Sequence, residues 1–550
     1  MLSGAMENTR SASFTVPLPI APGSSRHPDE YPDKLDAALF RIAGVCGLAC
    51  IMAVLDSTVV AVAQRTFIEQ FGSTQAIVSW TIAGYMLAFA TVIPITGWAA
   101  DRFGTKRLFM GSVLIFTLGS LLCAVAPNIL LLILFRVVQG IGGGMLLPLS
   151  FVILTREAGP KRVGRLMAVG GIPILLGPIS GPILGGWLIG AYGWEWIFLV
   201  NLPIGLTAFA LAAVMFPKDQ SSPSEALDIT GALLLSPGVA IFLCGVCSIP
   251  GRRTISDPYV LAPAVVGLAL IAAFIVHAWY RTDHPLIDLR LFRNPVVTQV
   301  NVTLLVFGAA SVGVGLLVPS YFQIAGHETP MQSGLHMLPV GIGAVLTMPL
   351  GGAFMDKRGP GNIVLIGLPL MAAGLGVFTY GVATRAEYSP VLVSGLAIMG
   401  LGAGLTTTPL SAALMQALAP RQVARGTTLI SVNQQVGGSI GAALMAVILT
   451  NQFNRNEALM AANEMAGVHR GAGKRDLPVD PSALPRQTMT PDLASHVSHH
   501  LSHAYATVFV LAVVLVAFTI IPASFLPRKP PTPPVDEVRA DVPATAADRR

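Results

Sequence analysis

The chain contains fourteen runs of mainly apolar residues. Each is about 20 residues long, the length at which a helix crosses the hydrocarbon core of a bilayer. The pattern predicts an all-α polytopic membrane protein with 14 transmembrane helices. The runs fall at 38–62, 76–99, 107–127, 129–151, 165–190, 196–216, 229–249, 258–280, 297–319, 334–354, 361–383, 389–414, 428–450 and 504–526.

Composition excludes a soluble protein. Charged residues make up 11% of the chain and hydrophobic residues 53%, whereas about 25% charged residues is usual in soluble domains. The formal net charge of +6 comes from basic residues scattered among short loops, which argues against nucleic acid as a partner. All five cysteines lie inside apolar runs, and Cys244-x-x-Cys247 lacks the second ligand pair of a zinc site, so no metal site is predicted there.

The distribution of Lys and Arg predicts that both termini are cytoplasmic, because short cytoplasmic loops are enriched in these residues. With the N-terminus inside, the short inner loops hold fifteen Lys and Arg residues and the short outer loops hold four. Residues 1–37 and the proline-rich segment 527–550 are predicted to be disordered cytoplasmic tails. The protein is therefore expected to be a multi-pass protein of the cell (inner) membrane.

A short charged turn occurs twice, which indicates an internal duplication. Residues 97–107 read Gly-Trp-Ala-Ala-Asp-Arg-Phe-Gly-Thr-Lys-Arg, and a shortened copy begins 255 positions later at Gly352. The repeat predicts two six-helix bundles, 38–216 and 297–526, with an inserted helix pair in 217–296. The second bundle includes a long external loop, 451–503. Paired halves of this kind place a substrate site between them near the membrane midplane.

The turn resembles the signature between helices 2 and 3 of the major facilitator superfamily, a resemblance that implies the fold of that superfamily. The signature positions are filled by Gly97, Asp101, Arg102, Gly104, Lys106 and Arg107, and the second copy keeps Gly352, Asp356, Lys357 and Gly359. By this resemblance the two turns are expected to take part in conformational gating. The alternative for any one such turn is a positive-inside loop with no further role.

Asp56 is the only carboxylate well inside a predicted helix. A charge at that depth costs roughly 2.5 to 3.5 kcal/mol on insertion scales, so such residues usually face a cavity, are paired and are functional. Arg136 lies in the fourth predicted helix at a similar depth and is the predicted partner of Asp56. The stretch Arg136-x-x-Gln139-Gly140 resembles the superfamily's helix 4 signature, whose arginine is linked to proton translocation. A purely structural tie between helices is the alternative for both residues.

The fifth helix is rich in glycine and proline. Gly181-Pro182-x-x-Gly185-Gly186 resembles the helix 5 motif that is associated with exporters in the superfamily, although helix packing alone can produce such a stretch. The segment 193–205, Gly-Trp-Glu-Trp-Ile-Phe-Leu-Val-Asn-Leu-Pro-Ile-Gly, is similar to one that is typical of the fourteen-helix drug:proton antiporters, the EmrB/QacA group.

Polar side chains inside the predicted helices are candidates for a drug-binding cavity, and each of them could equally form a hydrogen bond between helices. They are Tyr85, Gln139, Asn301, Tyr321, Gln323, Asn433 and Gln434. At the end of the external loop, four histidines, His496, His499, His500 and His503, share one helical face. An interfacial helix is the favoured interpretation of this face, with a metal site as the alternative.

The resemblance implies a proton-driven multidrug efflux transporter, which would exchange lipophilic or cationic compounds for protons and so confer antibiotic resistance. It would need no cofactor, and an adaptor protein is a possible partner if the cell has an outer membrane. A proton-coupled exporter of an endogenous metabolite, lipid or siderophore is the alternative. An enzyme is disfavoured because the predicted helices hold no cluster of His, Asp, Ser or Cys near one face, and no Walker-type loop suggests an ATP-driven pump.

Overall fold

The computed structural model describes residues 36–158, 162–219, 227–252, 257–282, 285–418, 422–454 and 493–528. Nearly all of the two predicted tails lies outside these ranges. Within them, thirteen helices are long and apolar enough to cross a membrane. The remaining predicted span, 165–190, coincides with a 30-residue helix whose described apolar stretch covers Val163–Ile172, so the fourteenth crossing stays a prediction.

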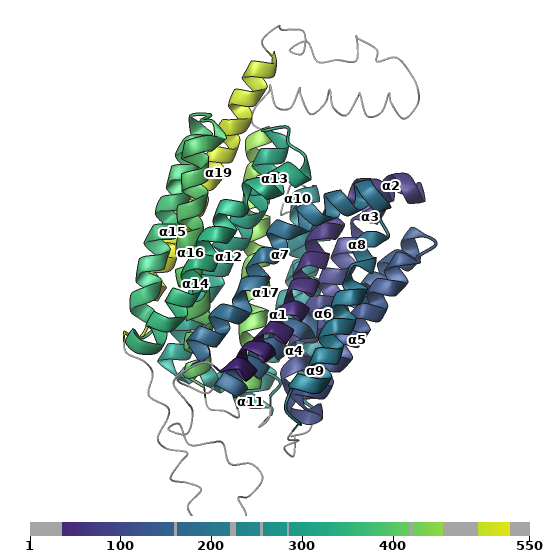
Figure 1. Ribbon diagram of the computed structural model, residues 1–550, viewed down its shortest axis with the longest axis vertical. Coiled ribbons are helices and arrows are strands. Elements are labelled where there is room, and N and C mark those ends of the chain that lie inside the picture. The colour runs from purple at the N-terminus through teal and green to yellow at the C-terminus, as the bar shows by residue number, and fades with distance from the viewer. Residues whose placement is uncertain are drawn as a thin grey trace, which may run out of the picture.

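The N-terminal half is a bundle of long helices (Figure 1). Asp36 begins it by accepting a hydrogen bond from the Leu39 amide at 2.8 Å, which caps the first helix. The short helix α2 (Gln64–Phe71) occupies what the sequence indicated as a loop, and the short helix α3 (Gln75–Val78) lies at the start of the predicted span 76–99. The long elements are α1 (Ala37–Val62), α4 (Trp80–Phe103), α5 (Thr105–Ala124), α6 (Ile129–Ala158), α7 (Val163–Tyr192) and the broken pair α8 (Trp196–Leu199) and α9 (Asn201–Met215).

The C-terminal half forms a second bundle beside the first (Figure 1). Its second crossing begins with a separate short helix, capped by a reciprocal hydrogen-bonded box between Thr329 and Gln332. The elements are α12 (Pro295–Ile324), α13 (Pro330–His336), α14 (Leu338–Arg358), α15 (Pro360–Ala383), η3 (Tyr388–Leu392), α16 (Val393–Gln416), α17 (Val423–Asn454) and α19 (Leu493–Ala523).

The segment that the sequence predicts as an external loop, 451–503, is helical at both ends. α17 continues to Asn454, and α19 already begins at Leu493. Both helices continue past their apolar runs into polar sequence, because backbone hydrogen bonding extends a helix without regard to hydropathy. Residues 455–492 lie outside the described ranges.

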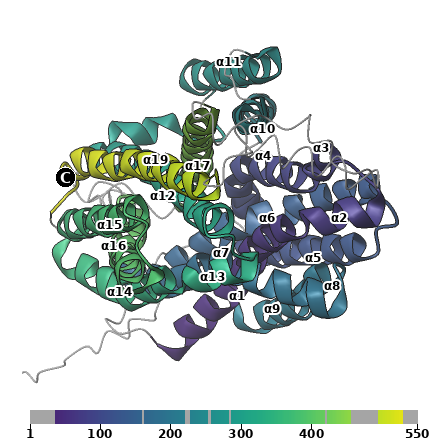
Figure 2. The ribbon, with the colours of Figure 1, turned by 90° about the horizontal axis from the view of Figure 1, so that it is seen from above.

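The inserted helices α10 (Ile229–Arg252) and α11 (Pro258–Tyr280) lie at the edge of the molecule (Figure 2). α10 packs against α4 and α17, and α11 packs against α10. The Nε2 atom of His277 lies 2.9 Å from Oδ1 of Asp228, which joins the end of α11 to the start of α10. The η2 turn (Leu289–Arg293) then leads into α12.

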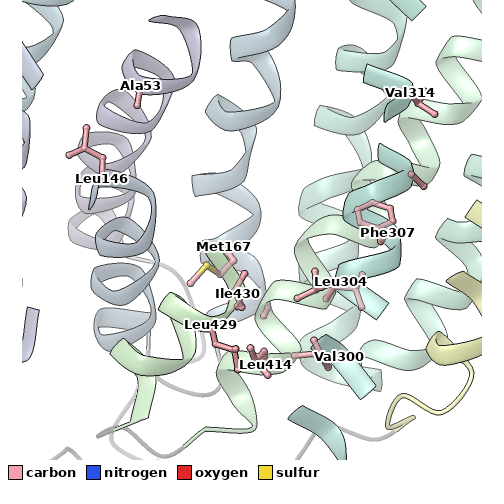
Figure 3. Packing of buried hydrophobic residues seen from close by; sticks show 14 of the residues in the cluster. Ala53, Leu146, Met167, Val300, Leu304, Phe307, Val314, Leu414, Leu429 and Ile430 are labelled. Carbon is pink, nitrogen blue, oxygen red and sulfur yellow. The ribbon is translucent and has the colours of Figure 1, made fainter. Parts of the chain in front are cut away.

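One apolar cluster of buried side chains runs through both halves. Figure 3 shows members from each half, including Met167 on α7 and Ile430 on α17. A second apolar cluster fills the end of the N-terminal half that lies away from the Asp101 turn, around Phe67, Trp194 and Phe198. The first cluster therefore ties the two bundles together, whereas the second belongs to one bundle.

Candidate functional site: a buried ion pair and the contacts between the halves

Asp56 on α1 and Arg136 on α6 form an ion pair in the N-terminal half. Nη1 of Arg136 donates to Oδ2 of Asp56, and both side chains are completely buried. The same Nη1 atom also donates to Oε1 of Gln139 at 2.6 Å. The structure thus brings together the two charged residues that were singled out inside the predicted helices.

Two amides complete the surroundings of the carboxylate. Nε2 of Gln139 and Nδ2 of Asn201 donate to Oδ1 of Asp56 at 2.8 and 3.0 Å. Each amide also donates to Oγ of Ser120, at 2.7 and 3.3 Å respectively. The ionised form of Asp56 therefore accepts hydrogen bonds from three side chains, which stabilises it away from water.

The guanidinium of Arg136 is held on its other sides by α4. Its Nε atom donates to the backbone oxygen of Thr81 at 3.0 Å, and Cζ lies 4.1 Å from the centroid of the Tyr85 ring. The Tyr85 hydroxyl donates to the backbone oxygen of Ala53 at 3.2 Å, which ties α4 to α1. Among the described residues, Nη2 of Arg136 has no hydrogen-bond partner, so one buried donor is left for a new contact.

Protonation of Asp56 would remove the negative charge that balances the buried Arg136 guanidinium. The ion pair is neutral as a whole, and neutralising only the carboxylate leaves a buried guanidinium without its counter-charge. Breaking a buried pair in this way typically costs about 3–5 kcal/mol. Proton uptake at Asp56 therefore favours any rearrangement that gives Arg136 a new partner or access to water.

Ser120 and Asn201 also belong to the site, although neither was predicted from the sequence. Asn201 stands in the segment 193–205, where an amide inside an apolar run was a usable signal. Ser120 gives no such signal, because a serine readily satisfies its hydroxyl within its own helix. Only the tertiary structure shows that Asn201 on α9 binds the carboxylate and that Ser120 on α5 contacts the two amides that do so.

If the chain exchanges protons for compounds, as the resemblance implies, Asn201→Leu should lower that exchange by about tenfold, because a hydrogen bond to a charged group contributes roughly 1.5–3 kcal/mol. The measurement is proton release from inside-out vesicles at matched protein levels. Thr207→Val on α9 is the control, since its hydroxyl is exposed and bonds to Pro203 of its own helix. Equal rates for Asn201→Leu and the native protein would remove Asn201 from the site.

The glycine-rich motif of α7 packs directly against α1. A Cβ atom on Gly181 would overlap Thr58, and one on Gly185 would lie 3.1 Å from the Val59 side chain. The Thr58 hydroxyl also lies 3.4 Å from the backbone oxygen of Gly177. Gly186 faces the other half, where its Cβ would lie 3.7 Å from Met331 on α13, and Pro182 is half-buried within the helix. The motif thus touches both the helix that carries Asp56 and the C-terminal half.

Gly181→Ala is expected to destabilise the α1–α7 contact by about 1–3 kcal/mol, the usual cost of overpacking. The melting temperature of the detergent-purified protein measures this effect. Thr58→Gly should restore part of the loss in the double variant, because it removes the side chain that the new methyl group meets. An unchanged melting temperature in Gly181→Ala would contradict the close contact.

The two duplicated turns make equivalent contacts between the halves. A Cβ on Gly97 of α4 would lie 2.6 Å from the Thr428 hydroxyl and 2.8 Å from the Ala424 backbone oxygen, both on α17. A Cβ on Gly352 of α14 would overlap the backbone of Gly164 at the start of α7. Each half thus presents a glycine to the backbone of the other half on the same face of the membrane.

The other residues of the first turn stabilise the N-terminal half itself. Asp101 pairs with Arg156 of α6 at 2.7 Å. The amide nitrogens of Lys106 and Arg107 donate to the Asp219 carboxylate at 2.8 and 3.0 Å, so a residue that was not predicted caps α5. Gly104 adopts φ +87°, which favours glycine.

The Lys106 ammonium donates to the backbone oxygens of Ala213 and Phe216 at 2.7 and 2.9 Å, at the end of α9. Arg102 is exposed, and the Asp356 side chain lies outside the described residues. The turn therefore fastens α4, α5, α6 and α9 into one unit.

The candidate cavity residues fall into separate places. Tyr85 and Gln139 belong to the ion-pair site. Nδ2 of Asn433 donates to the backbone oxygen of Asn301 at 2.7 Å, a bond between α17 and α12. Tyr321 packs edge-on against the Tyr505 ring with centroids 5.5 Å apart. Gln323 and Gln434 are half-buried.

The histidines of α19 were considered as a metal site. The rings of His499 and His503 have centroids 4.9 Å apart, and the His496 side chain lies outside the described residues. Across the described ranges, no group of three or more His, Cys, Asp or Glu side chains is arranged to hold a metal ion.

Comparison with known proteins gives the family. The model of the Major Facilitator Superfamily matches residues 45–442. The chain is 62% identical to the multidrug resistance protein B homolog of Mycobacterium tuberculosis (strain ATCC 25618 / H37Rv) over 531 residues, which cover 96% of this chain and 98% of that protein. It is 30% identical to the multidrug export protein EmrB of Haemophilus influenzae, over 75% of this chain and 81% of that protein.

Among solved structures, the proton:xylose symporter XylE superposes with a TM-score of 0.55 at 16% identity, over 92% of this chain and 99% of that one. The family model and the relatives, on a fold shared with a solved transporter, define an integral membrane transporter rather than an enzyme. The chain belongs to the Major Facilitator Superfamily.

Proposed function

We propose that the chain is a proton-driven multidrug efflux transporter that exports lipophilic or cationic compounds. The observation that carries the proposal is the fully buried Asp56–Arg136 ion pair. Its helices lie next to the interface between the halves, because α1 packs against α7 and α6 packs against α17. Relatives at 62% and 30% identity are named as multidrug resistance and multidrug export proteins, which supports the substrate class.

In the proposed cycle, a proton from outside neutralises Asp56, and the unpaired Arg136 then favours the inward-facing state. Separation of Gly97 from α17 and of Gly352 from α7 opens the cytoplasmic side to the compound. Binding of the compound and inward release of the proton restore the ion pair and return the bundle to the outward-facing state. The contacts of α7 with α1 and α13 link the site to the interface.

Energy in this scheme comes from the proton gradient, without a cofactor. One proton moving down 100 mV supplies about 2.3 kcal/mol, to which any pH gradient adds. We also propose that both termini are cytoplasmic, that the protein is inserted in the inner membrane, and that it is divided into two bundles with an inserted helix pair. The proposal also includes Asn301, Tyr321, Gln323, Asn433 and Gln434 as substrate contacts in other states of the cycle, and an adaptor protein where an outer membrane must be crossed.

Inside-out vesicles with an imposed pH gradient test the proposal. Adding a lipophilic cation such as tetraphenylphosphonium should release protons from vesicles with the native chain, and the cation should accumulate only while the gradient persists. Accumulation that survives collapse of the gradient would rule out antiport. Proton release with an endogenous metabolite or lipid, and none with any lipophilic compound or antibiotic, would favour the alternative exporter.

A further inference from the structure

A groove on the lipid-facing side of the C-terminal half lies between α12 and α19, which are adjacent in Figure 2. It encloses about 340 Å³. The most exposed of its large apolar side chains are 45% to 65% accessible, so the groove opens away from the interface between the halves. Its lining consists of Thr298, Gln299, Val302 and Val306 on α12, Phe518, Ile521 and Pro522 on α19, and Phe525 just after α19.

The position and length of the groove match one leaflet of a bilayer. Its lining residues lie in the first half of α12 and near the end of α19, on the membrane face that carries the Asp101 turn. From Thr298 to Val306 the helix rises about 12 Å. One leaflet of the hydrocarbon core is about 15 Å thick, so a single acyl chain fits along the groove.

Two exposed basic residues lie close in sequence to the groove, on the membrane face where α12 begins and α19 ends. Arg293 is exposed in the η2 turn, five residues before Thr298, and Arg528 is exposed three residues after Phe525. The carboxylate nearest in sequence is that of Asp288. Its Oδ1 atom accepts a hydrogen bond from the backbone amide of Arg290 at 2.9 Å. Each basic residue near the surface strengthens binding of an anionic headgroup by about fivefold.

We propose that this groove is a binding site for an anionic phospholipid, with one acyl chain between α12 and α19 and the phosphate at Arg293 and Arg528. The basic rim argues against the cationic compounds proposed for export, because it repels them. The proposal is independent of proton coupling.

The test is native mass spectrometry of the detergent-purified full chain, titrated with phosphatidylglycerol or with phosphatidylcholine of the same acyl chains. The native chain should retain phosphatidylglycerol at about 25-fold lower concentration than phosphatidylcholine, because each of the two basic residues contributes about fivefold. Arg293→Gln/Arg528→Gln should abolish that preference, and Val302→Trp should reduce retention by filling the groove. Arg41→Gln/Lys218→Gln is the charge control and removes two exposed charges from the same membrane face. Leu316→Trp is the size control and places a tryptophan on exposed α12 surface further along the helix.

Neither control should change lipid retention. Equal retention of the two lipids by the native chain would overturn the proposal. So would an equal loss in Arg41→Gln/Lys218→Gln, or no effect of Val302→Trp. Displacement of the lipid by tetraphenylphosphonium in the native chain but not in Val302→Trp would assign the groove to an exported compound instead.

Discussion

Asp56→Asn is expected to abolish compound-driven proton release from inside-out vesicles while compound binding stays within about threefold of the native value. Asparagine keeps the shape of the side chain and can still accept hydrogen bonds, but it cannot exchange a proton in the cycle. Compound binding is expected to survive because the Asp56 side chain is fully buried and is bonded to Arg136 and Gln139, so a bound compound would not contact it directly. Proton release and equilibrium binding, measured on the same preparations, check the two halves of this expectation.

Stability needs a separate control, because Asp56→Asn leaves Arg136 without its counter-charge at a cost of about 3–5 kcal/mol. Asp56→Asn/Arg136→Gln removes both charges, and it should melt at a higher temperature than the single variant while remaining uncoupled. Asp228→Asn changes another buried carboxylate, which pairs with His277 outside the site, and it should keep coupling. Native-like proton release in Asp56→Asn would move coupling to another residue.

Gly97→Val and Gly352→Val are expected to lower efflux at least tenfold by holding the two halves apart on the face that carries the Asp101 turn. The new side chains would meet backbone atoms of α17 and of α7, which cannot move aside as a flexible side chain can. Overpacking of this kind costs about 1–3 kcal/mol, enough to shift a balanced equilibrium between two states by tenfold. Hydrogen exchange should speed up around 97–107 and 423–430 in Gly97→Val.

Gly111→Val on α5 is the matched control, because a Cβ there meets no atom within 4 Å. It should leave both efflux and hydrogen exchange at native levels. If the interface variants behave like this control, the close contact between the halves has no part in gating. If only one of them loses activity, the two turns do not act as equivalent gates.

Most of the fold could be predicted from the sequence, because the bilayer imposes a local length rule. Thirteen of the fourteen predicted spans correspond to helices that are long and apolar enough, and the repeated turn at Gly97 and Gly352 indicated the duplication. The structure adds detail where hydropathy stops being informative. Examples are the polar ends of α17 and α19, the short helix α2, and the breaks that separate α3 from α4 and α13 from α14.

For the site, the sequence by itself determined the charged residues. A carboxylate and a guanidinium inside apolar helices are costly in lipid, so Asp56 and Arg136 stood out and their pairing could be predicted. Only the tertiary structure decided that Asn201 binds the carboxylate and Ser120 the amides beside it, that Asp219 caps α5, and that the glycines of both turns contact the opposite half. Hydrogen-bond partners and close backbone contacts depend on which helices become neighbours, and that choice is made by packing over the whole chain rather than by any local pattern.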